Sequence, residues 1–580
     1  MSKPRGVPHA PALGHSVPEA AFRKNRNSGP LNKERPLQET FPSRRRVSEV
    51  DTKAEGFRSS YRDHACILVM TLLIWGTHTL WLSMDSRPPV WYMAIHQSYA
   101  FNYLAFVHGE SATMPFWAMS GYYPPFVHLL IALVWFVSRP DPQLATLANL
   151  PATVVLLWAV YELGAQLAGR TAGRWAALIT AFTPYLIWMS RETILDYWLS
   201  AWVAASLVVL RRADGFLHRR RSFQLGIVMA LGLLTKWLFA AFVIFPLLYV
   251  VIRQRVWQDA TRLRNLVASL LIAAALAGIW YVPNLAGMLR FFRQKDAAGA
   301  LEGEPPPLSF ESFVYYLRLL EGYQLFALLF SFLMVSCAFV WRKRLIRDAG
   351  FLAVTISGAW LVLTVLRTKD PRYTMPLLGL LAILPGAWIQ SWGNAWPAGA
   401  CKMLLTATLV LQTYVINFGA SWLPEAVVLA EGYTGSLRWD WNLYLQHYFH
   451  ILGPPRLEDW RHGEILHKIA RHAQYNGVSP SLGVAPDLPR FNANNFALSA
   501  RLLGSAAPVS RLVLTPAGLY PLEHLNYVII ADGDQGPAWT TTTNEAVNRI
   551  IRESPMFQFL TAYPLPNGSM ARLYSVGHNK

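Results

Sequence analysis

Hydrophobic runs long enough to cross a lipid bilayer recur along most of this 580-residue chain. They lie near 64–84, 144–167, 173–190, 192–211, 262–282, 323–341, 349–366, 373–392 and 400–422. A double-length run at 222–252 is expected to turn once near Lys236, because a lysine is costly in the middle of a bilayer. With 53% apolar and only 15% charged residues, the chain is predicted to be an α-helical polytopic membrane protein with about eleven transmembrane helices.

The basic residues lie in short clusters between the hydrophobic runs. A net charge of +18 is also found in nucleic-acid-binding proteins, but this distribution follows the positive-inside rule of membrane proteins. We therefore expect a lipid bilayer as partner and no nucleic acid. Residues 1–62 are polar and rich in Pro, Ser and Arg, and we expect them to form a disordered basic cytoplasmic tail. The three cysteines have no metal-ligand spacing, so neither a disulfide framework nor a zinc site is expected.

The positive-inside rule decides whether the short apolar segment 122–137 crosses the membrane. If this segment crosses the membrane, the basic loop from Arg211 to Arg221 becomes external; if it is a re-entrant or surface helix, every strong basic cluster lies inside. We adopt the second topology, which also places the C-terminal residues outside. The charged residues left on the external face are then Asp85, Arg87, Glu110, Arg191, Glu192, Asp196, Lys236, Arg290, Arg293, Lys295, Arg318, Arg367, Lys369, Asp370 and Arg372. Their convergence predicts a site where basic groups hold a lipid phosphate and a carboxylate abstracts a proton.

The composition changes to that of a soluble domain after about residue 422. Short apolar runs at 482–485, 511–514 and 527–530 predict buried strands, and the stretches 460–473 and 544–553 predict helices. The predicted organisation is a basic tail over 1–62, a transmembrane domain over 63–422, and an extracytoplasmic α/β domain over 423–580.

Five features, in this order and spacing, resemble one known group of enzymes. They are an acid just after the first crossing (Asp85), Gly-Tyr-Tyr-Pro-Pro at 121–125, Ser-Arg-Glu-Thr-Ile-Leu-Asp at 190–196, Gly-Leu-Leu-Thr-Lys at 232–236, and Lys-Asp-Pro-Arg-Tyr-Thr-Met-Pro at 369–376. Together they resemble the GT-C superfamily of polyprenyl-phosphate-sugar glycosyltransferases, over roughly residues 64–392. The branch concerned contains the protein O-mannosyltransferases and the lipid A aminoarabinose transferase, and is similar to glycosyltransferase family 39.

The resemblance implies a role for each matching residue. Asp85 matches the acid that deprotonates the acceptor, which then attacks the anomeric carbon in an inverting displacement. Lys236 matches the lysine of the family's glycine-leucine-threonine-lysine turn, and Arg372 and Tyr373 match the motif near the carrier phosphate. A Lys or Arg there is expected to hold the phosphate and stabilise negative charge as the bond breaks. The other residues implied in substrate binding are Arg191, Asp196 and Tyr123.

The chain also departs from the family pattern around the proposed base. Many relatives have a second acid after the first one or after the loop tryptophan, where this chain has Ser86 and Tyr92. Glu110 is therefore a second candidate for the base. His96 and His108 are also considered, although a lone loop histidine is more often a solvated surface group. Because no paired acids lie near Asp85, no metal and no other cofactor are expected.

Three classes of function remain open. The first is an enzyme that transfers a sugar from a polyprenyl-phosphate donor to a glycan, lipid or protein acceptor, in the bacterial inner membrane with a periplasmic C-terminal domain. The second is a lipid-carrier transporter or flippase, against which the absence of an internal sequence repeat argues. The third is a non-catalytic relative that binds polyprenyl phosphate.

Overall fold

The computed structural model describes residues 44–110, 114–419, 426–432, 435–440, 454–505 and 507–577. The chain divides into two units, residues 1–59 and 60–580, and the helices after α1, the α/β domain and the candidate site all lie in the second unit. Residues 1–43 fall outside the described residues, so their predicted disorder stays a prediction. Residues 44–62, by contrast, form the first part of helix α1 (Arg44–Ser83).

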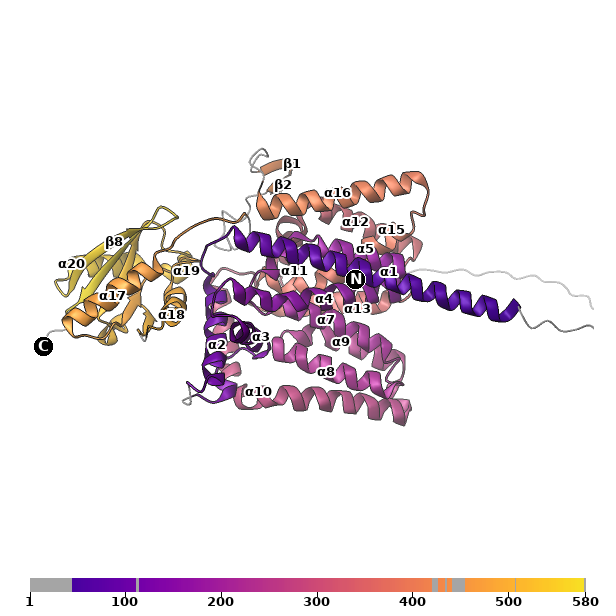
Figure 1. Ribbon diagram of the computed structural model, residues 1–580, viewed down its shortest axis with the longest axis horizontal. Helices are drawn as coiled ribbons and strands as arrows, with labels where there is room; N and C mark the ends of the chain where they lie inside the picture. The colour runs from indigo at the N-terminus through magenta and orange to yellow at the C-terminus, as the bar shows by residue number, and fades with distance from the viewer. Residues whose placement is uncertain are drawn as a thin grey trace, which may run out of the picture. The chain divides into compact units, whose positions relative to one another are not determined.

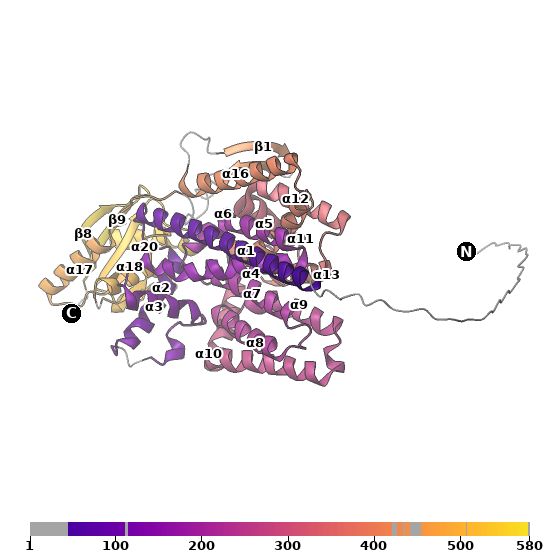
Figure 2. The same cartoon turned by 45° about the vertical axis from the view of Figure 1, so that its right-hand side comes forward.

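Helices make up the described part of the chain up to residue 419 (Figure 1). After α1 their bounds are α2 Trp91–Val107, α3 Phe126–Val137, α4 Leu150–Leu167, α5 Arg170–Ala181, α6 Pro184–Ser190, α7 Asp196–Arg212, α8 Arg219–Thr235, α9 Phe239–Arg253, α10 Ala260–Leu301, α11 Phe310–Leu319, α12 Phe326–Lys343, α13 Ala349–Val365, α14 Met375–Leu381, α15 Ile383–Gln390 and α16 Trp396–Phe418. Helices α8 and α10 lie side by side in both views (Figures 1 and 2).

The helices follow the hydrophobic runs of the sequence. In the described residues, five helical stretches are long and apolar enough to cross a membrane by length and composition alone. They are Asp63–Ser83, Leu144–Leu167, Ala260–Gln294, Pro371–Gln390 and Trp396–Val415. The run 222–252 breaks where predicted, because α8 ends at Thr235 and α9 begins at Phe239. The total of eleven crossings stays a prediction.

Helix α10 extends well beyond the hydrophobic run 262–282. Helix α10 continues through Pro283 to Leu301, and α11 occupies 310–319. Membrane helices tolerate an internal proline because local adjustments and neighbouring groups satisfy the freed backbone carbonyl. The residues after Pro283 include Leu, Ala, Met, Arg and Gln, which favour helix.

Charged residues gather at the two ends of the helices. Helix α7 begins at Asp196 and ends at Arg212, about 25 Å away at 1.5 Å per residue. At the end marked by Arg212, that side chain bonds Glu162 at 2.6 Å, and Arg211 bonds Asp348 at 2.9 Å. The end marked by Asp196 carries the candidate site described below. The structure thus separates the two sets of charges that the topology assigned to opposite faces.

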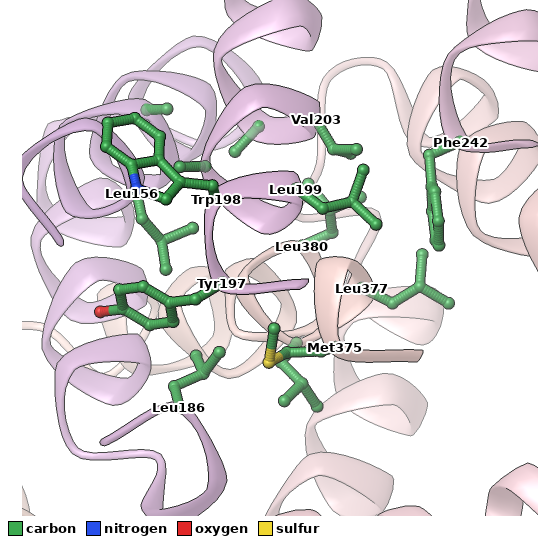
Figure 3. Close-up of a cluster of buried hydrophobic side chains, with 14 of the residues drawn as sticks. Leu156, Leu186, Tyr197, Trp198, Leu199, Val203, Phe242, Met375, Leu377 and Leu380 are labelled. Atoms are coloured by element: carbon green, nitrogen blue, oxygen red, sulfur yellow. The ribbon is translucent and has the colours of Figure 1, made fainter. Parts of the chain in front are cut away.

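Large apolar side chains fill the centre of the helical domain. Figure 3 shows the part of this core where α4, α6, α7, α9 and α14 meet. The labelled residues there are Leu156, Leu186, Tyr197, Trp198, Leu199, Val203, Phe242, Met375, Leu377 and Leu380. Each of them is less than 5% exposed. This packing fixes α7, which carries Asp196 at its first position.

Replacing Gly173 with leucine is expected to destabilise the protein. Helices α4 and α5 pack backbone against backbone there: a Cβ on Gly173 would overlap the Tyr161 carbonyl oxygen, and a Cβ on Gly164 would lie 2.9 Å from the Gly173 Cα. Overpacking of this kind costs about 1–3 kcal/mol or more. Thermal unfolding in detergent should show a lower midpoint for Gly173→Leu. Gly287→Leu, where the added Cβ meets nothing within 4 Å, is the matched control and should unfold like the parent.

The C-terminal residues form the predicted α/β domain. Its five-stranded sheet has the order β4-β3-β7-β9-β8, with β3 (Leu482–Val484) parallel to β4 (Val509–Arg511) and to β7 (Tyr527–Asp532). Strands β8 (Phe557–Pro564) and β9 (Met570–Val576) are antiparallel additions that the sequence did not predict. The predicted helices are present as α17 (His462–Asn476) and α20 (Asn544–Glu553).

The α/β domain contacts α2 through hydrogen bonds from helix α18 (Ala493–Leu502) and the segment before it. Asn495 Nδ2 donates to the Pro89 carbonyl at 2.5 Å, and the Trp91 backbone N–H donates to the Pro489 carbonyl at 3.0 Å. Arg501 donates to the Asn102 side chain at 2.7 Å. These contacts place the domain beside the start of α2, as Figure 1 shows.

Acidification is expected to loosen the α/β domain through His462. Its ring stacks on Phe491 with centroids 5.5 Å apart, and burial lowers the pKa of His462 to about 4. Because the unfolded chain takes up this proton near pH 6.5, stability is complete above that pH and falls by about 3 kcal/mol on going down to pH 4. Hydrogen exchange of residues 462–476 in the full-length protein measures this loss. His462→Phe should remove most of it; an unchanged loss would contradict the role of His462.

Candidate active site

A cavity of about 1110 Å³ lies between the helical domain and the α/β domain, and we call it the basic cavity. The α/β domain contributes Asp487, Asn494, Arg511 and Trp539 to its lining. Five basic residues of the helical domain also line it, namely Lys236, Arg293, Arg367, Lys369 and Arg372. They come from separate segments of the chain. Five acids, Asp196, Glu302, Glu304, Asp370 and Asp487, line the same cavity, so the fold brings cations and acids together at one end of the helices.

Lys236 enters the cavity at the break between α8 and α9. Its Nζ donates to Asp196 Oδ1 at 2.7 Å and lies 5.0 Å from the centre of the Tyr373 ring. The side chains of Lys236 and Asp196 are 9% and 2% exposed. A buried ion pair of this kind is strongly destabilised when one partner is removed, because the other charge is left unpaired. The pair therefore fixes the lysine at the cavity surface.

Arg372 is held by a second acid. Asp370 Oδ1 accepts hydrogen bonds from the Arg372 backbone N–H and from Nε, both at 2.8 Å, and Asp370 Oδ2 accepts from Nη2. Burial would raise the pKa of Asp370, but Arg372 holds it below its usual value. The guanidinium also lies 5.0 Å from the centre of the Tyr92 ring. A fixed guanidinium of this kind suits recognition of a phosphate.

Aromatic and histidine side chains form another part of the cavity wall. Tyr123 packs edge-on against His96, with ring centroids 4.7 Å apart, and both line the cavity. His96 Nδ1 lies 2.8 Å from His128 Nε2, at hydrogen-bonding distance, and both rings are buried. His96 is therefore not the solvated loop histidine that the sequence suggested. His108, by contrast, is exposed beside Glu110.

Asp85 belongs to a separate, buried charge cluster, which we define as Asp85, Arg87, Arg191, Glu192 and Arg490. Arg87 Nε donates to Asp85 Oδ1 at 2.5 Å, and the Arg456 backbone N–H donates to the same oxygen at 2.9 Å. Within the described residues, Asp85 Oδ2 makes no hydrogen bond. Asp85 does not line the basic cavity.

Glu192 joins the charge cluster to the basic cavity. It lines a small pocket of about 30 Å³, enough for a water molecule, together with Asp370 and Arg372. Its Oε2 is buried without a hydrogen bond to the described residues. Burial raises the pKa of Glu192 to about 8, against the opposing charges of Arg490 and Arg191.

Two other residues that the sequence predicted for the site, Arg191 and Glu110, lie outside the basic cavity. Arg191 lies in the charge cluster, where its Nη2 donates to Asn417 Oδ1 at 2.6 Å and its guanidinium lies 4.3 Å from the Trp81 ring. Glu110 follows the far end of α2, about 25 Å from Tyr92 by helix length, and its side chain is 67% exposed. The structure thus unites Asp196, Lys236, Arg372, Tyr373 and Tyr123, but not Glu110.

No role was predicted for the residues of the α/β domain that line the cavity. Asp487 accepts a hydrogen bond from Trp91 Nε1 at 3.1 Å and lies 3.5 Å from Arg511. Trp539 is 45% exposed and faces the cavity as part of the short helix α19 (Ala538–Thr541). No local motif marks these residues. Across the described ranges, no three His, Cys, Asp or Glu side chains come together in a way that could hold a metal ion.

Comparisons with known proteins agree with this architecture. Residues 122–282 match a family model described as dolichyl-phosphate-mannose-protein mannosyltransferase. No curated protein matches the sequence. The crystal structure of ArnT from Cupriavidus metallidurans in the apo state has a TM-score of 0.53 at 14% identity, covering 90% of this chain and 98% of that one.

Two further structures contain a bound lipid phosphate. ArnT from Cupriavidus metallidurans bound to undecaprenyl phosphate has a TM-score of 0.52 at 14% identity, covering 87% of this chain and 97% of that one. The archaeal oligosaccharyltransferase AglB from Archaeoglobus fulgidus, in complex with an inhibitory peptide and a dolichol-phosphate, has a TM-score of 0.50 at 10% identity, covering 89% and 74%. The predicted fold is thus confirmed: the chain is a multi-pass membrane protein with the GT-C fold and a C-terminal α/β domain.

Proposed function

We propose that this protein is an integral membrane glycosyltransferase that moves a sugar from a polyprenyl-phosphate-linked donor to an acceptor at the basic cavity. The observation that carries the proposal is that Lys236 and Arg372, each held in place by an acid, line one cavity at one end of the membrane helices. A lipid-linked phosphate needs such a site, with cations at the membrane surface and its chain in the bilayer. The family match and the lipid phosphates bound in two structures of the same fold support this assignment.

Lys236 and Arg372 are proposed to hold the donor phosphate. Asp196 and Asp370 orient them, and Tyr373 and Tyr123 shape the wall beside them. In the reaction, an acceptor oxygen or nitrogen attacks the anomeric carbon as the bond from that carbon to the phosphate oxygen breaks. The phosphate leaves with the bonding electrons, and the two cations stabilise its charge. The acceptor proton passes to a carboxylate base.

Asp85 is proposed as that base, following the family resemblance, because Oδ2 is the atom of its carboxylate left for a proton. In the structure, Asp85 does not line the basic cavity, whereas the stretch Val90–Met93 lines the small pocket beside Glu192, and Trp91 and Tyr92 of this stretch also line the basic cavity. The acceptor must therefore enter from the side of the charge cluster, or this stretch must shift. The α/β domain holds the stretch through Pro489 and Asp487, so movement of that domain would open it. Glu110 is too distant to serve.

The proposed location is a bacterial inner membrane, with the basic cavity and the α/β domain on the periplasmic face. The basic clusters at the opposite end of the helices support this orientation through the positive-inside rule. The acceptor is proposed to be a glycan, lipid or protein that reaches the cavity from the periplasm.

Lipid binding to the purified full-length protein tests the donor site. Undecaprenyl phosphate should raise the thermal unfolding midpoint, whereas undecaprenol, which has the same chain without the phosphate, should raise it far less. Arg372→Ala should abolish the difference between the two lipids. Equal shifts with both lipids would contradict a phosphate site, and an unchanged difference in Arg372→Ala would remove Arg372 from it.

A further inference from the structure

A second large space, separate from the basic cavity, is an apolar groove of about 1390 Å³ along α12 and α13. Leu333, Leu352 and Leu384 are among the apolar side chains that line it. The groove follows α13 from Ala349 to Thr364, about 22 Å at 1.5 Å per residue. That length exceeds the thickness of one leaflet, about 15 Å.

One end of the groove is strongly basic. Arg344 and Arg347, from the loop between α12 and α13, line it there, and Arg342 and Lys343 precede them. None of these four forms an ion pair with a described residue, although Arg211 and Arg253 at the same end both pair with Asp348. Trp341, also in the lining, is 85% exposed, as is typical of a tryptophan at a membrane interface.

The other end of the groove is closed by α11. The Leu308 backbone N–H and the Ser312 hydroxyl both donate to the Thr364 carbonyl, at 3.2 and 2.8 Å, and Trp360 Nε1 donates to the Phe313 carbonyl at 3.3 Å. These bonds hold α11 across the end of α13, between the groove and the basic cavity. A chain lying in the groove therefore has its polar end at the arginines.

We propose that this groove binds one anionic phospholipid from the leaflet opposite the basic cavity. Its phosphate lies between Arg344 and Arg347, and an acyl chain lies along α13. The charge at the mouth selects an anionic headgroup over a zwitterionic one, because two unpaired guanidinium groups gain a counter-ion there.

The lipid also supports the wall of the basic cavity. Phe313 and Leu317 of α11 line the groove, whereas Tyr315 of the same helix lines the basic cavity. An acyl chain packed against Phe313 and Leu317 therefore holds α11 in place, and with it Tyr315 in the wall of the basic cavity. Loss of the lipid is therefore expected to loosen α11.

Native mass spectrometry of the full-length protein tests the proposal, with phosphatidylglycerol and phosphatidylcholine of identical acyl chains as probes. The parent should retain phosphatidylglycerol at least about tenfold better. The double variant Arg344→Ala/Arg347→Ala should lose about 30-fold in affinity for phosphatidylglycerol and little for phosphatidylcholine. Arg255→Ala/Arg264→Ala, which removes two exposed arginines outside the groove, is the matched control and should behave as the parent.

A second variant tests the groove itself. Ala353→Trp places an indole in it without changing charge, and should lower retention of both lipids. Equal retention of the two lipids by the parent, or full retention by the arginine variant, would overturn the proposal. Displacement of phosphatidylglycerol by undecaprenyl phosphate in a Lys236→Met variant would assign the groove to the carrier lipid instead, and would also overturn it. None of these readouts depends on glycosyltransferase activity.

Discussion

Replacing Lys236 with methionine is expected to lower the rate of sugar transfer at least about a hundredfold, because the leaving phosphate loses a fixed cation in a partly buried site. Methionine keeps the length and most of the volume of lysine. Because the ammonium group of Lys236 is lost, both the bond to Asp196 and the contact with the donor phosphate are removed. The measurement is the rate of sugar release from a polyprenyl-phosphate-linked donor by the purified protein.

The Lys236 prediction needs a control for stability, since Asp196 is left buried without its partner at a cost of about 3–5 kcal/mol. Lys236→Met/Asp196→Leu removes both charges and should recover much of the stability without recovering the rate. Arg318→Met removes an exposed charge that does not line the basic cavity, and should leave the rate unchanged. Recovery of transfer in the double variant would show that Lys236 acts only through folding.

Replacing Asp85 with asparagine is expected to lower the turnover rate by about 10²–10⁴, the usual contribution of a general base. Asparagine has the same shape and can still accept the hydrogen bonds from Arg87 and the Arg456 N–H. Binding of undecaprenyl phosphate should therefore stay close to that of the parent, since Lys236 and Arg372 are untouched. Turnover and lipid binding, measured on the same preparation, separate these two effects.

Two further variants decide between the candidate bases. Glu110→Gln should have no effect, because Glu110 is exposed at the far end of α2. His96→Gln tests the buried histidine that lines the basic cavity. Full activity in Asp85→Asn together with loss of turnover in His96→Gln would transfer the role of base from Asp85 to His96.

Several element boundaries could be predicted from the sequence, because the residue types at these positions favour or disfavour a membrane helix or a buried strand. The turn at Lys236 was predictable because a lysine in mid-bilayer is costly, and the structure breaks the helix within three residues of it. The strands β3 and β7 were predictable as short apolar runs between polar segments. Strands β8 and β9 were missed because polar residues interrupt their apolar ones, Gln558 and Thr561 in β8 and Arg572 and Ser575 in β9.

The charged residues of the site could be predicted from the sequence, but the ion pairs and contacts that they form could not. The positive-inside rule predicted Asp196, Lys236 and Arg372 on one face of the membrane. The ion pair of Lys236 with Asp196, forty positions earlier, depends on how α7 packs beside α8, which the sequence does not show. His96 was misjudged because its burial comes from the contact of α2 with His128 of α3 and with Tyr123, which precedes that helix. Trp539 and Asp487 reach the cavity only through docking of the α/β domain on α2.

The most direct test of the central claim is mass spectrometry of lipid extracts and surface glycans from cells that lack this protein, carry the parent, or carry Lys236→Met. The proposed function predicts that one sugar-bearing surface species disappears without the protein while a polyprenyl-phosphate-linked sugar accumulates. The parent should reverse both changes, and Lys236→Met neither. Unchanged glycans and donor lipid in the absence of the protein, or full reversal by Lys236→Met, would contradict the account.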